Sequence, residues 1–261
     1  MADTLVFGGT GFVGEYVCKE LSGKSVVSID SSTREEDRDA FINNATRILW
    51  LVRPVEGLLE NLSAQLASAP KLQRFVFVSS MLAYPESDAP LDEATSLKPL
   101  NDYERAKAEE EKIVQRIFSR EPEKLVIARM ANVYGDVKNT GVVGKIFSAL
   151  RDGGVFTVYG DGSQRRDYIH VEDVARLLAT LLFEKDVRGV YNVSTGVPYA
   201  LTDVIAHVER ITGKKLQLAH GPSTGEKHSV VGKNDKILRL PGISIRETLD
   251  TGLRKTYNHY Q

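Results

Sequence analysis

The sequence predicts an α/β protein in which helices cover both faces of a parallel sheet. Short apolar runs with the length of buried strands alternate with segments whose apolar residues recur at helical spacing. The first of these runs also ends at a cluster of glycines that leads directly into a helical segment. Strands that alternate with helices form a doubly wound parallel sheet, because each helix returns the chain to the same edge.

The elements follow in order along the first half of the chain. Five runs have strand character: residues 4–7, 25–30, 47–52, 75–80 and 124–129. Three segments have helical character: residues 12–22, 56–68 and 101–118. A further helix is expected near residue 35, because Ser32 and Thr33 each precede a glutamate by three residues, as in a capping box.

The glycine-rich turn FGGTGFVG, at residues 7–14, predicts a dinucleotide site. Gly8 permits the tight turn, Gly11 lets the backbone approach a pyrophosphate, and Gly14 lets the helix pack against the strand. A glycine turn without a phosphate is the alternative, but Asp30 then ends the second strand, where it can accept from both ribose hydroxyls. Its carboxylate repels a 2'-phosphate and so favours NAD, while the nearby Arg34 keeps NADP as an alternative.

The composition excludes several classes of function. With 34 Lys and Arg against 35 Asp and Glu, the net charge is -1, which argues against nucleic acid and anionic membranes as partners. Cys18 is the only cysteine, so we expect neither disulfides nor a metal site. No apolar run approaches the roughly 18 residues of a membrane span, and no signal-peptide pattern stands at the N-terminus, so a cytoplasmic protein is expected.

Two tyrosines precede a lysine by four residues, and only Tyr103 with Lys107 lies in a helical segment. In the other pair, Tyr134 and Lys138, an intervening glycine and aspartate favour a turn. On a helix, Lys107 lies one turn from Tyr103 on the same face, where an ammonium lowers the pKa of a phenol. A surface helix pair is the structural alternative. Beside a nucleotide turn, and with Ser80 at the end of a strand, the pattern predicts a proton-transfer site.

These residues resemble the extended short-chain dehydrogenase/reductases, also called the NAD-dependent epimerase/dehydratase family. The resemblance rests on GGTGFVG, FVFVSSMLAY, YERAK, RMANVYG and YGDGSQRRDYIHVEDVA, which stand in the expected order along nearly the whole chain. The last of these segments is typical of members that act on nucleotide sugars. The closing SIRETLDTGLRKTYNHY resembles the last helix of the family, with Ser244 and Glu247 as its cap.

The resemblance implies a role for each residue that matches a motif. Tyr103 is implied as the general acid/base, Lys107 as its electrostatic partner and ribose anchor, and Ser80 as the orienting hydroxyl. Cofactor contacts are implied for Gly8, Thr10, Gly11, Phe12, Val13, Gly14, Asp30, Ser31, Leu51, Val52, Arg53, Ser79, Tyr103, Lys107 and Met130. Substrate contacts are implied for Ser80, Met81, Tyr103, Asn132, Arg166 and Lys227.

Arg166 is implied to pair with the diphosphate of the substrate, because a guanidinium binds phosphate oxygens in a bidentate manner. Arg165 beside it is an alternative for this contact, and an ion pair of Arg166 with Asp173 is the structural alternative. The segment GPSTGEKHS stands where the family commonly has an Arg-Pro-Gly-Asp type loop, so Lys227 or His228 substitutes for that arginine or the contact is missing.

The chain is expected to divide near residue 133. Residues 1–133 form a Rossmann-type dinucleotide-binding part that includes the catalytic helix. Residues 134–261 are rich in glycine and polar residues and form mainly a smaller, loop-rich, substrate-binding part, with some elements returning to the sheet. A homodimer through the helix at 101–118 is expected by analogy with the family.

The expected reaction is hydride transfer at a sugar carbon of a nucleoside-diphosphate sugar, with a 4-epimerase favoured. An NAD(P)H-dependent 4-ketoreductase or dehydrogenase of a keto-deoxysugar is the alternative, and a non-catalytic NAD(P)-sensing protein or an enzyme for a non-sugar ketone remains open. A 4,6-dehydratase is not expected, because Met81 and Leu82 follow Ser80 where dehydratases of the family carry Asp-Glu.

Overall fold

The computed structural model describes residues 3–261, which form two compact units. Unit 1 takes the described residues through Ala83, Pro99–Met130 and Ala175–Tyr191. Unit 2 takes Tyr84–Lys98, Ala131–Val174 and Asn192–Gln261. Each unit has a hydrophobic core of its own.

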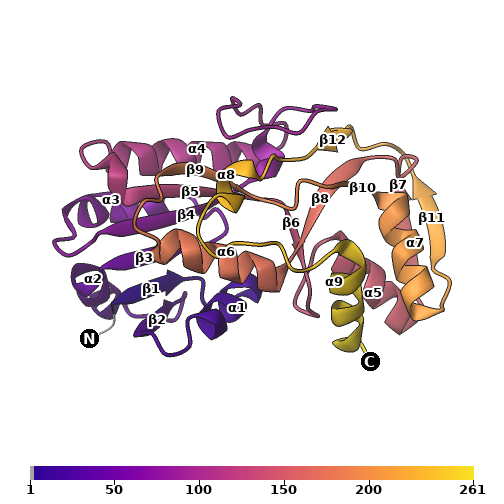
Figure 1. Cartoon of the computed structure of the whole chain (residues 1–261), viewed down its shortest axis with the longest axis horizontal. Helices are drawn as coiled ribbons and strands as arrows, with labels where there is room; N and C mark the ends of the chain where they lie inside the picture. The colour runs from indigo at the N-terminus through magenta and orange to yellow at the C-terminus, as the bar shows by residue number, and fades with distance from the viewer. Residues whose placement is uncertain (1–2) are drawn as a thin grey trace. The chain divides into compact units, whose positions relative to one another are not determined.

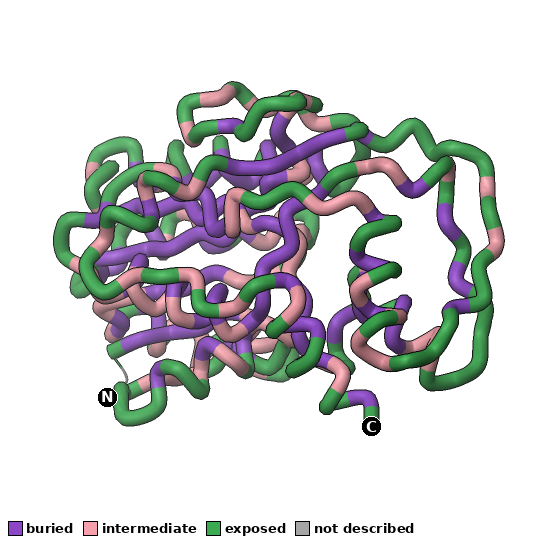
Figure 2. Tube along the Cα trace, turned by 45° about the vertical axis from the view of Figure 1, so that its right-hand side comes forward, coloured by how far each residue is buried: buried purple, intermediate pink, exposed green. Residues whose placement is uncertain are grey.

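A six-stranded sheet with the order β2-β1-β3-β4-β5-β9 is the centre of unit 1 (Figure 1). Its strands are β1 (Thr4–Phe7), β2 (Val26–Ile29), β3 (Arg47–Trp50), β4 (Arg74–Ser80), β5 (Leu125–Met130) and β9 (Gly189–Val193). The first five pair in parallel. β1 and β4 are buried along their whole length and β5 nearly so, and Figure 2 draws such buried residues in purple. The expected Rossmann-type sheet is therefore confirmed.

Among residues 3–261, four helices of unit 1 connect the five parallel strands, and a fifth precedes β9. They are α1 (Phe12–Glu20), α2 (Glu35–Asn44), α3 (Leu58–Ser68), α4 (Asp102–Ile117) and the part of α6 (Val171–Phe183) that begins at Ala175. Leu59, Leu62 and Leu66 of α3 share one core with apolar side chains of α2, α4 and the sheet. Their spacing of three and four residues brings all three to one face of the helix.

The predicted capping box at the start of α2, with Ser32 or Thr33 as the cap, is wrong. The N-cap residue is Arg34, whose side chain makes no capping bond. Thr33 Oγ1 instead accepts from Asp30 N at 3.2 Å, and Ser32 Oγ donates to the Asp30 carboxylate at 2.6 Å. These short polar side chains form a turn after β2, which competes with a cap at α2.

Unit 2 contains several short strands. β8 (Arg165–His170) pairs with β10 (Pro198–Ala200), β12 (Ser229–Val230) and β6 (Asn132–Tyr134), while β7 (Val155–Tyr159) pairs with β11 (Gln217–Gly221). Residues 151–170, polar and glycine-rich in sequence, thus contain two strands. The helices are α5 (Val142–Asp152), α7 (Leu201–Thr212), α8 (Asp235–Leu238) and α9 (Leu249–Asn258), together with the start of α6.

The prediction that Ser244 and Glu247 cap the last helix is also wrong. α9 begins after Thr248, whose Oγ1 accepts from Thr251 N at 3.2 Å, so Ser244 and Glu247 lie before the cap. Within residues 3–261, no helix has both the length and the apolarity that crossing a membrane requires.

Candidate functional site

The glycine turn between β1 and α1 is shaped by close backbone packing. Gly8 has a φ of +83°, and its N–H donates to Ile29 O of β2 at 2.8 Å. A Cβ on Gly14 would overlap Gly8 O and the backbone of Gly9, so only glycine lets α1 start this close to β1. Gly11 is the N-cap and makes no side-chain cap, which leaves the first N–H groups of α1 available to an anion.

A cavity of about 410 Å³ lies beside this turn, within unit 1. Its walls are Gly8, Thr10, Gly11, Phe12, Val13, Gly14, Leu51, Val52, Arg53, Val78, Ser79, Tyr103, Lys107 and Met130. All of the cofactor contacts implied by the sequence belong to this wall except Asp30 and Ser31. Val78 also belongs to the wall but was not predicted, although it directly precedes the expected site residues Ser79 and Ser80 on β4.

Asp30 and Ser31 follow the end of β2. The Oδ1 of Asp30 accepts from Ser32 Oγ at 2.6 Å and from Ser32 N at 2.9 Å. These bonds, chiefly the one from the Ser32 hydroxyl, lower the pKa of the Asp30 carboxyl. The residue is therefore held as an anion at the end of a strand adjacent to β1, and Ser31 is exposed.

Both the position of the cavity, beside the glycine turn, and the polar atoms in its wall suit a dinucleotide. Ser79 Oγ is buried without a hydrogen-bond partner among the described residues, and Ser79 belongs to the wall. A buried hydroxyl without a partner costs free energy, so a polar ligand in the cavity would relieve that cost. The open helix N-terminus beside it suits the pyrophosphate of the cofactor.

Tyr103 is placed by the N-terminal cap of α4. Asn101 Oδ1 accepts from Glu104 N at 3.0 Å, and the Glu104 carboxylate accepts from Leu100 N and Asn101 Nδ2 in return. This reciprocal bonding fixes where the helix begins. Tyr103 therefore lies in the first turn of α4, at the wall of the cavity.

Burial raises the pKa of the Tyr103 phenol, although 45% of the residue remains exposed. The hydrogen bond with Ser80 and the charge of Arg53 act in the opposite direction. The helical spacing predicted that Lys107 lowers this pKa, whereas the cation that lowers it in the structure is Arg53. Ser80 Oγ also accepts from Leu82 N at 3.2 Å, which orients the hydroxyl.

Lys107 is buried, with 4% of its surface exposed. Its Nζ donates to Val52 O at 3.1 Å, to Val78 O at 3.2 Å and to Glu110 Oε2 at 3.0 Å. Burial lowers the pKa of this ammonium, and the Glu110 carboxylate opposes that shift. Glu110 was not among the predicted site residues, although its place three residues after Lys107 on a helix is the signal for such a pair.

The implied substrate contacts other than Ser80, Met81 and Tyr103 lie in unit 2. Arg166, buried in β8, pairs with Glu226 at 3.5 Å and donates to His228 O at 3.3 Å. Asp173 instead accepts from the backbone N–H groups of residues 246 and 247, both at 2.9 Å, so the ion pair of Arg166 with Asp173 is not formed. Arg165 is exposed.

Asn132 and Lys227 belong to the same unit as Arg166. Asn132 is half-buried at the start of β6, which pairs with β8, and Lys227 is buried two residues before β12, which pairs with β8 as well. The sheet of unit 2 therefore gathers the segments that carry all three residues. Residues 3–261 contain no cluster of three or more His, Cys, Asp or Glu that could hold a metal ion.

The chain is similar in sequence to a known protein family and to individual known proteins. Residues 43–194 match the model of the NAD dependent epimerase/dehydratase family. A trifunctional UDP-glucose 4,6-dehydratase/3,5-epimerase/4-keto-reductase of Arabidopsis thaliana is 28% identical over 73% of this chain, which spans only 29% of that relative. The UDP-glucose 4-epimerase of Lactobacillus helveticus is 25% identical, covering 91% of this chain and 90% of the relative.

Solved structures share the fold over almost the whole chain. MoeE5, solved in complex with UDP-glucuronic acid and NAD, has a TM-score of 0.87 at 24% identity, and 98% of each chain is covered. A UDP-glucuronic acid 4-epimerase from Bacillus cereus, solved with UDP-glucuronic acid and NAD, also has a TM-score of 0.87, at 22% identity and with 98% of each chain covered.

Proposed function

The chain belongs to the NAD dependent epimerase/dehydratase family, and from this membership and the cavity of unit 1 we propose that it transfers hydride at C4 of a nucleoside-diphosphate sugar as a 4-epimerase. The observation that carries the proposal is the wall of that cavity. It brings the glycine turn, Tyr103 and Lys107 to one enclosed space beside the N-terminus of α1.

NAD is the cofactor of this family, and the cavity wall is the place that we assign to it. The first turn of α1 and Gly11 would hold the pyrophosphate, and Asp30 would accept from the adenosine ribose. Lys107 and Tyr103 would hold the nicotinamide ribose. When bound, NAD supplies a hydride acceptor and, once reduced, a hydride donor.

Tyr103 is the proposed general acid/base. Its phenolate accepts the proton of the sugar hydroxyl as the C–H bond gives up hydride, and its phenol returns a proton when the ketone is reduced from the other face. Ser80 donates to the same oxygen and keeps it within reach of Tyr103. Because burial raises the pKa of the Tyr103 phenol, ionisation needs positive charge nearby, which Arg53 supplies and a bound oxidised nicotinamide would increase.

The proposed substrate contacts of unit 2 are Asn132, Arg166 and Lys227. Arg166 is already held by Glu226 and by a backbone carbonyl, so its guanidinium is preorganised for a diphosphate. Relatives with dehydratase and reductase activities exist, so the choice of epimerase rests on this chain's own residues. After Ser80 stand Met81, which is buried, and Leu82, neither of which can remove or donate a proton.

Two measurements on one purified sample test this proposal. The protein is denatured, and any released nicotinamide nucleotide is identified by chromatography. Native protein is then incubated with UDP- and dTDP-sugars, and the sugars are followed by NMR. We expect NAD in near-stoichiometric amount and a 4-epimer as product. An empty protein that reduces 4-keto sugars with added NAD(P)H would identify a ketoreductase, and a 4-keto-6-deoxy product would identify a dehydratase.

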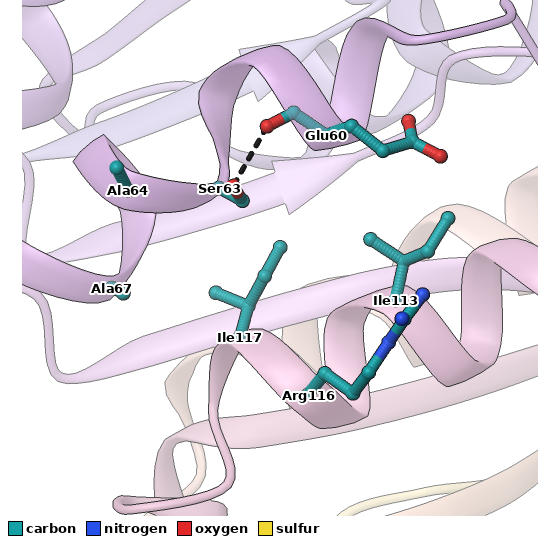
Figure 3. Close-up of a pocket in the computed structure, with 7 residues that line it drawn as sticks. All are labelled: Glu60, Ser63, Ala64, Ala67, Ile113, Arg116 and Ile117. Carbon is teal, nitrogen blue, oxygen red and sulfur yellow. Dashed lines mark hydrogen bonds between the residues drawn. The ribbon is translucent and has the colours of Figure 1, made fainter.

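We also propose that the protein is a homodimer. An apolar cavity of about 420 Å³ lies between α3 and α4, and Figure 3 shows Ile113 and Ile117 pointing from α4 toward α3. Glu60 on α3 and Arg116 on α4 border it with opposite charges. Across a two-fold axis, Glu60 of one protomer could meet Arg116 of its partner. Light scattering should give the mass of a dimer, and a monomer for Ile117→Glu; a monomeric wild type contradicts the proposal.

A further inference from the structure

Lys107 has a charged neighbour that the proposed catalytic set does not include. Glu110 lies one turn further along α4, with Oε2 at 3.0 Å from Lys107 Nζ. Only 5% of the Lys107 side chain and 11% of the Glu110 side chain are exposed. An ion pair at this depth is screened far less by water and salt than a surface pair.

The ammonium of Lys107 has three hydrogens, and each has an acceptor. Two go to Val52 O and Val78 O, in the wall of the cavity, and the third goes to Glu110. The two carbonyls belong to the backbone, one just after β3 and one in β4. They hold the Lys107 ammonium in place but carry no full charge. Glu110 alone among these three acceptors carries a negative charge that can be lost by protonation or by substitution.

The charges around this pair come from α3, α4 and the segment after β3. Burial raises the pKa of Glu110, Lys107 opposes that shift, and Glu60 of α3 adds to it. Glu110 in turn raises the pKa of Tyr103, while Arg53 lowers it.

Glu111, also on α4, acts on Lys107 as well. Its carboxylate is engaged by Arg129 of β5 through two bonds, Nε to Oε1 at 3.0 Å and Nη2 to Oε2 at 2.7 Å. Both side chains of that pair are less than 10% exposed. The negative charge in direct contact with Lys107 is therefore that of Glu110.

We propose that Glu110 is a positioning residue, which holds the Lys107 ammonium at the wall of the cofactor cavity and offsets part of the positive charge that reaches Tyr103. The inference rests on the proposed function, in which Tyr103 moves a proton. Its consequence is electrostatic: removal of one negative charge stabilises the deprotonated form of every neighbouring group.

Glu109 provides the matched control on the same helix. It precedes Glu110 by one residue, its side chain is 53% exposed, and it pairs at 2.9 Å with Lys112, whose side chain is 67% exposed. Like Glu110→Gln, Glu109→Gln removes one negative charge from α4, but from a side chain that is exposed to solvent. The comparison of Glu109→Gln with Glu110→Gln therefore isolates the effect of the buried contact.

The first test needs no turnover. Protein labelled with ¹³C at the lysine Cε is titrated by NMR, and the Lys107 signal is assigned by its loss in Lys107→Met. In Glu110→Gln, the titration midpoint of Lys107 should fall by about one pH unit or more, and in Glu109→Gln it should stay where it is in the wild type. An unchanged midpoint in Glu110→Gln overturns the proposal. If that variant does not fold, Glu110→Met is titrated instead, with the same two outcomes.

The second test uses the pH profile of kcat/KM. Glu110→Gln should move both limbs of the profile to lower pH by a similar amount with little change in the KM for the nucleotide sugar, and Glu110→Asp should restore part of the shift. A purely structural role would lower kcat at every pH without moving the limbs. If the wild type turns over no nucleotide sugar, the proposed function fails, and the midpoint of Lys107 still decides on Glu110.

Discussion

Each unit of the molecule buries a carboxylate, and the two carboxylates have different partners. In unit 1, Glu110 faces the Lys107 ammonium at 3.0 Å. In unit 2, Asp167 accepts from Thr195 N at 3.0 Å, Thr195 Oγ1 at 2.9 Å and Gly196 N at 2.7 Å, all of them neutral donors. Burial raises the pKa of both carboxyls, that of Asp167 to about 6.

Because their partners differ, the two carboxylates have different roles. Glu110 changes the charge at the candidate site, and Asp167 holds a loop in place. A carboxylate paired with a cation changes the charge that the cation presents to its surroundings. A carboxylate met by backbone N–H groups instead fixes the segment that carries them, here residues 195–196 between β9 and β10. The following substitutions probe the two arrangements.

The largest effect is expected in unit 1 from Tyr103→Phe. The variant keeps the ring and loses the hydroxyl that exchanges the proton, so kcat should fall by roughly 10²- to 10⁴-fold. Because the glycine turn, Asp30 and Lys107 still hold the cofactor, the content of bound nicotinamide nucleotide should stay near that of the wild type. Full turnover in Tyr103→Phe would remove this residue from the mechanism.

The buried pair of Arg129 and Glu111 should contribute mainly to stability. Arg129→Met leaves Glu111 buried without its cation, which should lower the free energy of unfolding by about 3 to 5 kcal/mol in urea titrations. The double variant with Glu111→Leu should recover most of this loss, since no charge is then left unpaired. A double variant no more stable than Arg129→Met would show that the pair does more than balance charge.

Gly14→Ala tests the packing of the glycine turn. The added Cβ would overlap Gly8 O, so α1 must move away from β1 and the phosphate site with it. We expect a loss of NAD affinity of about a hundredfold by calorimetry, which corresponds to about 2.7 kcal/mol. Gly154→Ala is the control, because a Cβ there meets nothing closer than 3.9 Å. Equal affinities in both variants would contradict the assigned phosphate site.

The smallest effects concern the pH dependence of unit 2. Because the folded-state pKa of Asp167 is raised to about 6, the native state binds this proton more tightly than the unfolded chain. Its contribution should therefore make the protein less stable as pH rises from about 4 to 6, by roughly 2 kcal/mol. Asp167→Asn should remove that slope in urea unfolding curves; an unchanged slope would show that Asp167 does not titrate there.

His170 should act in the opposite direction. Burial lowers its pKa from 6.5, and its Nε2 is buried without a partner among the described residues. Its neutral form therefore stabilises the native state above pH 6.5, and this contribution is lost as pH falls through the lowered pKa. His170→Gln should make the protein less sensitive to acid than the wild type.

The sequence predicts unit 1 better than unit 2, for a physical reason. The strands of unit 1 are short apolar runs, such as Arg74–Ser80, whose seven residues are all buried. β8 is buried almost completely too, yet its sequence RRDYIH has no apolar pattern, because Arg166, Asp167 and His170 are buried among polar partners. Hydrophobic periodicity carries no signal for such a strand.

The same limit applies to the candidate site. Spacing alone indicated Tyr103 with Lys107, because i and i+4 on a helix face the same way. It could not show that the third hydrogen of Lys107 goes to Glu110, or that Arg53 is the cation that acts on Tyr103. Both facts depend on contacts that only the folded chain makes.

We propose that Tyr103 removes the hydroxyl proton of a nucleoside-diphosphate sugar while the sugar is oxidised, with NAD as the hydride acceptor that the cavity of unit 1 would hold. The most direct test is to mix the NAD-loaded protein rapidly with UDP-sugars and to follow the near-ultraviolet absorbance of reduced nicotinamide. We predict a transient rise in the wild type and its loss in Tyr103→Phe, with NAD content equal in both. A protein that retains NAD and gives no transient and no product with any nucleotide sugar would contradict the account.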